Sequence, residues 1–184
     1  MKKRLAVALM VLFFLSGCAL GDTSGSVQTD SGGKDNIPGT YIVPEGWVKS
    51  EQYSSEDKIF YVEEGHEKDT RPDNISIEIG TNRYGLDEHD KFRYAILRQL
   101  SMQSKGSSAN VTGEGVHTEQ DYIMYIFTID DDYALTRQYY IVDDHRYCLI
   151  HLTDFSGNED AADAARAIAD SFVWDETDTP VLAP

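Results

Sequence analysis

Two runs of aspartate are the clearest candidates for chemistry in this sequence, Asp130-Asp131-Asp132 and Asp143-Asp144. Each run follows an apolar stretch, so their carboxylates would meet if both lay at the same end of neighbouring hairpins. Calcium takes about 6–8 oxygen ligands, although neither run has the glycine and terminal glutamate of an EF-hand loop. Two carboxylates flanking a pocket would instead suit glycoside hydrolysis, but no segment indicates such a pocket. The sequence therefore assigns no metal ligand and no catalytic residue, and leaves both chemistries open as alternatives.

The remaining reactive side chains favour structural roles. Cys148 lies within an apolar run, which predicts a small buried side chain rather than an exposed nucleophile. We expect His89 and His145, which lie in acidic turns, to be solvated, and His151 to face away from Cys148. No two histidines have the spacing of a metal motif, and there is no G-x-S-x-G, P-loop or G-x-G-x-x-G. The five histidines are His66, His89, His117, His145 and His151.

Tyrosines gather in the second half of the chain. They would either form an exposed aromatic strip for a ligand or cover the second face of a sheet. The tyrosines concerned are Tyr122, Tyr125, Tyr139, Tyr140 and Tyr147.

The N-terminus indicates export. Lys2-Lys3-Arg4 precedes the apolar stretch Leu5–Leu15, which is shorter than the roughly 20 residues that span a bilayer and typical of a secretory signal. The next residues, Ser16-Gly17-Cys18, complete a segment that resembles the lipobox of bacterial lipoproteins. That resemblance implies a signal peptide at 1–17, cleavage before Cys18 and a diacylglycerol thioether on Cys18. Two acyl chains anchor a protein stably. The alternative is an ordinary signal sequence with an incidental cysteine.

Composition then divides the chain. Residues 18–36 read as a lipidated N-terminus and a flexible linker rich in Gly, Ser, Thr and Asp. A folded domain is expected over 37–176, followed by a short tail at 177–184. By the lipobox resemblance, the domain would lie on the outer face of a bacterial cell membrane, held to it by the N-terminal lipid.

The charge balance limits the partners. The chain has 16 Lys+Arg, three of them in the leader, against 32 Asp+Glu, and its formal charge is −16. This excess argues against nucleic acid, and against contact of the folded domain with anionic lipid. It is consistent with a solvated acidic surface, with cation binding or with a basic partner.

The patterning predicts an α+β domain. Ile75, Ile77 and Ile79 alternate as in a half-buried strand, whereas Phe92, Ile96 and Leu100 recur at helical spacing. Hairpin turns dominate, so we expect a mainly antiparallel β-sheet with helices packed against it, in the order β-β-β-α-β-β-β-β-α. The strands are expected within 39–50, 58–65, 74–82, 109–120, 122–132, 135–144 and 146–155, and the helices within 86–106 and 156–174.

Local signals refine this expectation. The polar, glycine-marked strand at 109–120 should lie at a sheet edge. Ser156 and Glu159 have the spacing of a capping box for the last helix. Along that helix, one narrow face should let it approach the sheet closely; its residues are Ala161, Ala165, Ile168 and Phe172.

Short packing and turn motifs indicate a fold family. The segments YIVPEGWV (41–48), NISIEI (74–79) and AIADSFVW (167–174) resemble the Mog1/PsbP-like fold, found in bacterial lipoproteins with PsbP-like or DcrB-like domains. The resemblance spans about 40–174. We expect Trp47 and Trp174 to be core or rim aromatics that close the ends of the sheet. The resemblance implies that the protein is an accessory or binding module rather than a catalyst.

The sequence thus predicts a membrane-anchored envelope lipoprotein that meets a protein partner or an envelope ligand, needs no cofactor and does not bind nucleic acid. Cys18, as the site of lipid attachment, is the only functional residue it assigns. An envelope hydrolase with an acidic site, or a calcium-binding module, remains the alternative.

Overall fold

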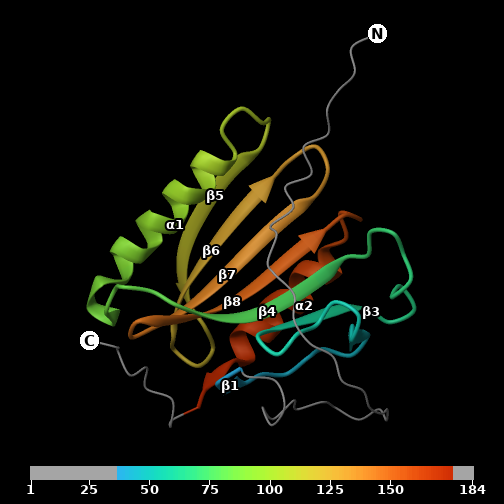
Figure 1. The fold of residues 1–184 in the computed structure, drawn as a ribbon, viewed down its shortest axis with the longest axis horizontal. Coiled ribbons are helices and arrows are strands. Elements are labelled where there is room, and N and C mark those ends of the chain that lie inside the picture. Colours follow the sequence, from blue (N-terminus) through green and yellow to red (C-terminus); the bar gives the residue numbers. More distant parts are fainter. Residues whose placement is uncertain (1–36, 176–184) are drawn as a thin grey trace.

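A seven-stranded antiparallel sheet with one helix on each face organises the chain (Figure 1). The structure is a computed structural model that describes residues 37–175. The predicted signal peptide (1–17), the segment 18–36 with Cys18 and the tail 177–184 lie outside the described residues. The predicted α+β class and its mainly antiparallel sheet are confirmed.

Every strand pairing in the described part is antiparallel. The sheet has the order β2-β3-β4-β8-β7-β6-β5, and β1 pairs separately with β9. The polar strand β5 lies at one edge of the sheet, as predicted, with β2 at the other. The elements are β1 (Gly39–Thr40), β2 (Trp47–Lys49), β3 (Lys58–Glu63), β4 (Asn74–Thr81), η1 (Leu86–Glu88), α1 (His89–Gln103), β5 (Asn110–His117), β6 (Ile123–Asp130), β7 (Leu135–Asp143), β8 (Arg146–Asp154), α2 (Glu159–Ser171) and β9 (Val173–Trp174).

The first core lies between the sheet and α2. The predicted narrow face of α2 is fully buried, with Ala161, Ala165 and Ile168 at 0% exposure. Small side chains let the helix approach the sheet, where Ile75 and Ile77 of β4 meet it, also at 0% exposure. The alternation seen in the sequence therefore marks the α2 side of β4.

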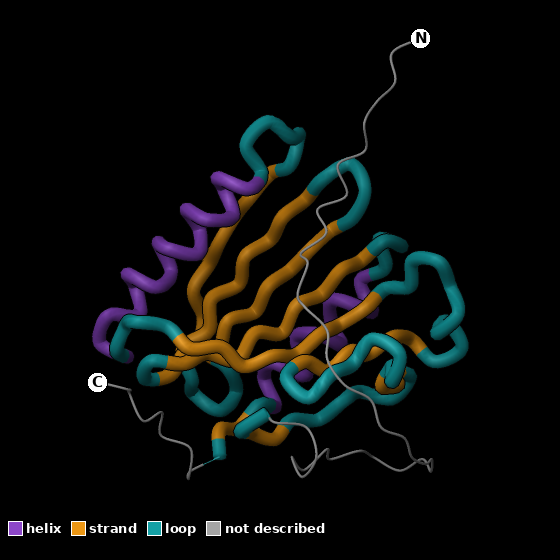
Figure 2. Tube along the Cα trace, in the orientation of Figure 1, coloured by secondary structure: helices purple, strands orange, loops and turns teal. Residues whose placement is uncertain are grey.

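The second core lies between the sheet and α1, on the opposite face (Figure 2). It is rich in aromatic rings: Tyr140 lies 5.5 Å from Phe92 of α1 and 5.7 Å from Phe127 of β6, between ring centroids. Both clusters lie wholly within the described residues. Because a domain with its own core folds as a unit, we expect this part of the chain to fold without its flanking segments.

The start of α2 differs from the prediction. Its N-cap is Asn158, whose side chain accepts a hydrogen bond from the backbone N–H of Asp160. Ser156 does not form the predicted capping box with Glu159. Its hydroxyl donates to Asp73 at 2.5 Å and accepts from the backbone of Asn158 at 3.0 Å. The hydrogen bond to Asp73, which is distant in the sequence, thus replaces the predicted capping hydrogen bond of Ser156.

The tyrosine strip does not form. Tyr125, Tyr140 and Tyr147 pack into the α1 core, whereas Tyr122 and Tyr139 pack on the α2 side. Tyr139 and Tyr140 are adjacent in one strand, so their side chains point to opposite faces. Burial raises the pKa of Tyr140, and it raises that of Tyr125 to about 12. These tyrosines therefore fill both sides of the sheet.

Candidate functional site

The two aspartate runs lie at opposite ends of β7, because one precedes this strand and the other follows it. Their carboxylates therefore do not converge, and the condition for a shared site, which the sequence left open, is not met. Both runs have local structural roles: Asp131 accepts from the backbone of Tyr133 at 2.7 Å, and Asp143 accepts from Arg146 at 2.7 Å. Within residues 37–175, no three His, Cys, Asp or Glu side chains are grouped to hold a metal ion.

Cys148 lies at 0% exposure in the α2-side core, and burial raises the pKa of its thiol. It is a packed side chain, as predicted. His151 lies on the other face of β8, also as predicted. It pairs in register with Ser76 and Gln138. Burial, with a smaller effect from Lys58, lowers the pKa of His151 to about 4.

The two histidines expected to be solvated are partly buried instead. His89 lies 2.5 Å from the hydroxyl of Tyr125, through its Nδ1 atom, and the two rings stack. His145 occupies the β7–β8 turn with a φ of 58°, and its side chain is 25% exposed. The local sequence does not predict this partial burial of either histidine.

An open pocket forms where the β2–β3 hairpin meets α2. The turn Pro44–Trp47 closes through a hydrogen bond from the N–H of Trp47 to the carbonyl of Pro44, at 3.3 Å. Gly46 has a φ of 87°, which a side chain would strain, at the third position of this turn. The turn delivers the half-buried Trp47 to the edge of the sheet, on the side covered by α2.

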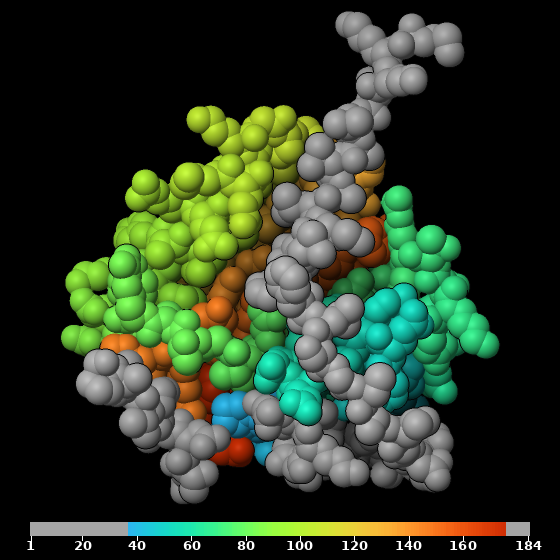
Figure 3. Space-filling view, in the orientation of Figure 1, coloured from blue at the N-terminus to red at the C-terminus, as the bar shows by residue number. Residues whose placement is uncertain are grey.

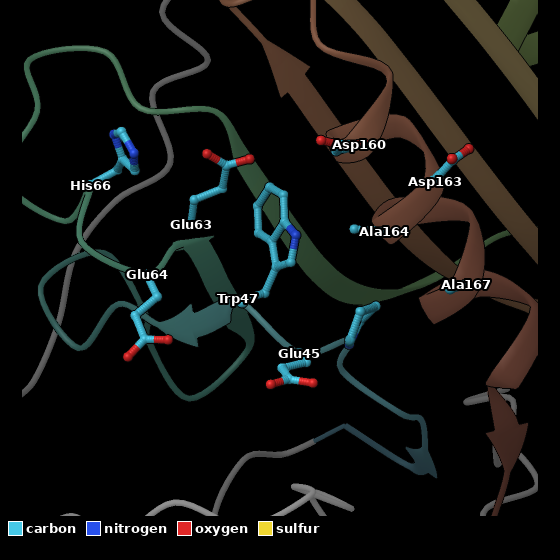
Figure 4. A pocket seen from close by; sticks show the side chains of 11 residues that line it. Glu45, Trp47, Glu63, Glu64, His66, Asp160, Asp163, Ala164 and Ala167 are labelled. Carbon is cyan, nitrogen blue, oxygen red and sulfur yellow. The ribbon is translucent and has the colours of Figure 1, made fainter.

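Acidic side chains line the pocket that contains this indole ring, and Glu63 lies beside the ring (Figure 4). Glu63 lies directly opposite Trp47 in the β2–β3 register, so both side chains are on the same face. Across from them, Ala164 and Ala167 of α2 leave space beside the ring. The pocket has a volume of about 730 Å³. We call it the Trp47 pocket; its acidic residues are Glu45, Glu63, Glu64, Asp160 and Asp163.

The pocket has an excess of negative charge. Among the residues that the structure describes, none of these five carboxylates pairs with a lysine or arginine. The one lining side chain that can become positive is His66, whose Nδ1 lies 2.8 Å from Asp69. This hydrogen bond and the charge of Asp69 raise the pKa of His66, with smaller contributions from Glu63 and Glu67.

This arrangement suits a cation larger than a metal ion. An aromatic face attracts an ammonium or guanidinium group, and surrounding carboxylates add to that attraction. The lining contains no Ser, Thr or Cys that would act as a nucleophile. The pocket is wide enough for a side chain such as lysine or arginine together with part of its backbone.

The sequence did not reveal this pocket. It marked the segment Pro44–Trp47 as a turn, but nothing in it brings Glu63 of the hairpin beside Asp160 and Asp163 of α2. Trp174, expected with Trp47 to be a core or rim aromatic, is a buried member of the α2-side core, and the Arg146 guanidinium lies 4.2 Å from its ring centroid.

None of the described helices is long and apolar enough to cross a membrane. No protein-family model matches the chain, and no curated protein matches it. Similarity appears at the level of solved structures, where the fold alone is shared.

The solution structure of cyanobacterial PsbP (CyanoP) from Synechocystis sp. PCC 6803 aligns with a TM-score of 0.54 at 16% sequence identity. The alignment covers 86% of this chain and 98% of that one. A crystal structure from Bacteroides thetaiotaomicron aligns at 11% identity and a TM-score of 0.41, over 74% of this chain and 45% of that one. The first alignment shows that this chain has a PsbP-like fold.

Proposed function

We propose that this protein is a non-catalytic binding module, held at a membrane through a lipid on Cys18, that binds a basic segment of a partner protein in the Trp47 pocket. The observation that carries the proposal is the combination of one half-buried indole with five carboxylates that have no lysine or arginine partner among the described residues. The PsbP-like fold is consistent with the coarse part of the proposal, an accessory or binding module, which the sequence motifs also implied.

A basic protein segment fits the pocket better than a metal ion or a scissile substrate. The carboxylates come from the turn before β2, the end of β3 and the first turns of α2, and so surround the ring. They do not converge on a single point. An extended segment with one arginine or lysine over Trp47 would meet carboxylates on more than one side.

The expected affinity is modest and depends on salt. A cation over an exposed aromatic ring contributes about 0.5–1 kcal/mol, and each exposed ion pair about 0.2–1 kcal/mol. Such charges are screened beyond about 8–10 Å at physiological ionic strength. A membrane tether would offset this weakness by raising the local concentration of a membrane-bound partner.

Calorimetric titration of residues 19–184 with a synthetic peptide of alternating arginine and glycine tests the pocket. We expect saturable binding that weakens with salt, and no binding of an alternating glutamate-glycine peptide. Trp47→Leu should weaken binding about fivefold, which corresponds to about 1 kcal/mol. The double variant Glu63→Gln/Asp163→Asn should weaken it by a similar factor.

The matched control is Glu56→Gln/Asp57→Asn, which removes the same charge from exposed positions at the far end of the β2–β3 hairpin. If this control weakened binding as much as the pocket variants, the peptide would be responding to net charge and the pocket proposal would be wrong.

Detergent phase partition tests the anchor separately. The intact chain should enter the detergent-rich phase after export by a bacterial host, whereas the Cys18→Ser chain should not acquire a diacylglycerol group detectable by mass spectrometry. A mature chain that begins elsewhere and carries no lipid would contradict the anchor and leave the pocket proposal standing.

A further inference from the structure

The outward side of α1 carries apolar and basic side chains together. Lys91, Tyr94, Arg98 and Met102 follow one another at three- and four-residue spacing, which places them on one side of the helix. The opposite side carries Phe92, which is buried in the α1 core. Tyr94 is 66% exposed and Met102 65% exposed. Large apolar groups on this helix thus point to solvent rather than to the core.

This helix is locally basic in an acidic protein. α1 contains three basic residues (Lys91, Arg93 and Arg98) and one acidic residue, Asp90, with Asp87 and Glu88 just before it, in a chain whose formal charge is −16. A groove of about 800 Å³ runs along the same surface, and none of the described residues that line it carries a carboxylate. Lys91 pairs with Glu88 at the start of the helix, whereas Arg98 is exposed near the middle. We call this surface the α1 face; its residues are Arg83, Lys91, Tyr94, Arg98 and Met102.

We propose that the α1 face lies on the surface of a membrane that contains anionic phospholipid. Guanidinium and ammonium groups attract lipid phosphates, and exposed Tyr and Met side chains suit the boundary between headgroups and acyl chains. Figure 3 shows α1 as a continuous yellow-green ridge along one flank of the molecule. The inference rests on the tether of the proposed function, which keeps the domain beside a bilayer.

The tether makes a weak surface contact effective. Residues 19–36 separate Cys18 from the described domain, and 18 residues span at most about 60 Å even when fully extended. A domain confined in this way meets the membrane as if at high local concentration. A face too weak to recruit a free protein can therefore still orient a tethered one.

The net negative charge does not oppose this orientation strongly. The acidic residues of the Trp47 pocket lie with α2 on the other face of the sheet from α1 (Figure 1). Their effect at the α1 face is screened, because the Debye length is about 8 Å at physiological ionic strength. A nearby bilayer responds mainly to the charges that face it. Net charge alone predicts repulsion from anionic lipid, and the distribution of charge predicts one attractive face.

The test measures how fast the Met102 side chain is oxidised when the protein is attached to a membrane. Residues 18–184 are coupled through the Cys18 thiol to a maleimide lipid, in vesicles of phosphatidylcholine with or without about one third phosphatidylglycerol. Cys148 is at 0% exposure, so coupling is selective for Cys18. The rate of Met102 oxidation by dilute peroxide is followed by mass spectrometry, and Met124, at 0% exposure, serves as the internal reference. Chemical coupling makes the test independent of lipidation in cells.

We expect Met102 to oxidise at least about threefold more slowly on the phosphatidylglycerol vesicles than on phosphatidylcholine alone. Arg98→Glu should abolish the difference. The matched control Arg71→Glu makes the same charge change at an exposed position in the β3–β4 loop and should preserve it. Both are surface substitutions, and circular dichroism checks that each variant is folded.

Equal rates of Met102 oxidation on the two kinds of vesicle would overturn the proposal. This holds whether Met102 is accessible on both or is protected on both by contact between protein copies. Equal effects of Arg98→Glu and Arg71→Glu would also overturn it, because binding would then follow net charge rather than the α1 face. Trp47→Leu should leave Met102 protection unchanged. A failure of membrane docking is therefore distinguishable from a failure of the Trp47 pocket.

Discussion

The fold should lose stability between pH 7 and pH 5, because buried His151 stays neutral while the unfolded chain gains a proton at this residue. The imidazole lies on the sheet face opposite α2, between the neutral side chains of Ser76 and Gln138 on the neighbouring strands. Its Nδ1 atom is 3.5 Å from the amide nitrogen of Gln138. Burial disfavours the charged imidazolium, and the nearby Lys58 adds to this effect, so the pKa falls to about 4.

The sign and size follow from proton linkage. In the unfolded chain the pKa of His151 is about 6.5, so this chain gains a proton as the pH falls while the folded protein does not until about pH 4. The stabilisation is complete above pH 6.5 and is lost as the pH falls towards 4. One pKa unit corresponds to about 1.4 kcal/mol, so the difference at pH 5 is about 2 kcal/mol. That is a large share of the typical stability of about 5–15 kcal/mol.

Urea unfolding of residues 19–184 at both pH values, with and without His151→Gln, measures this effect. The relevant quantity is the change in unfolding free energy between pH 7 and pH 5, so any fixed cost of the substitution cancels. Wild type should lose about 2 kcal/mol more than the variant. His117→Gln serves as a control, because the His117 side chain is 61% exposed. If the His151→Gln protein loses as much stability as wild type, the desolvation argument is wrong.

Three further outcomes test the local structure. Asn158→Ala should lower the free energy of unfolding by about 1 kcal/mol in urea titrations, because it removes the cap of α2. Gly80→Ala should cost at least about 1 kcal/mol, since a Cβ there would lie 2.2 Å from Cζ of Tyr147 and displace this ring; a neutral result in thermal melts would contradict the packing. The pKa of His66, measured by NMR titration, should lie above 6.5 and fall in Asp69→Asn. Protonated His66 should also weaken binding of the basic peptide in the Trp47 pocket, so affinity should decrease as the pH falls through this pKa.

Periodicity predicted the core elements well because it directly reflects burial. Ile75 and Ile77 alternate onto the α2 side of β4, and Phe92 and Leu100 bury the inner side of α1. The polar sequence of β5 likewise predicted its place at the sheet edge, where no further strand covers its outer side. These predictions depended only on neighbours along the chain.

The relative position of the aspartate runs was left open, although the sequence held the information needed to decide it. Consecutive hairpin turns in an antiparallel meander lie at alternating ends of the sheet. The turn after Asp130 precedes β7 and the turn containing Asp144 follows it, so the two runs had to lie apart. The order of the hairpins alone therefore excludes a shared cation site.

The capping box and the pocket depended on contacts between distant segments. Ser156 had the right spacing from Glu159, but Asp73 binds its hydroxyl from 83 residues away. Likewise, the Trp47 pocket exists only because the edge hairpin packs beside α2. Sequence spacing carries no information about either contact.

The distribution of charge, rather than its sum, connects the two proposed surfaces. The acidic Trp47 pocket lies with α2, and the basic α1 face lies on the other side of the sheet. A domain oriented by the α1 face would therefore present its pocket away from the bilayer, where a basic segment of a partner can reach it. Reversing the charge of Arg98 should then reduce capture of a partner anchored beside the protein in the same vesicle, by releasing the orientation, while leaving the affinity for a free basic peptide unchanged. Equal loss of both would mean that Arg98 acts on the pocket itself, contrary to the separation of the two surfaces by the sheet.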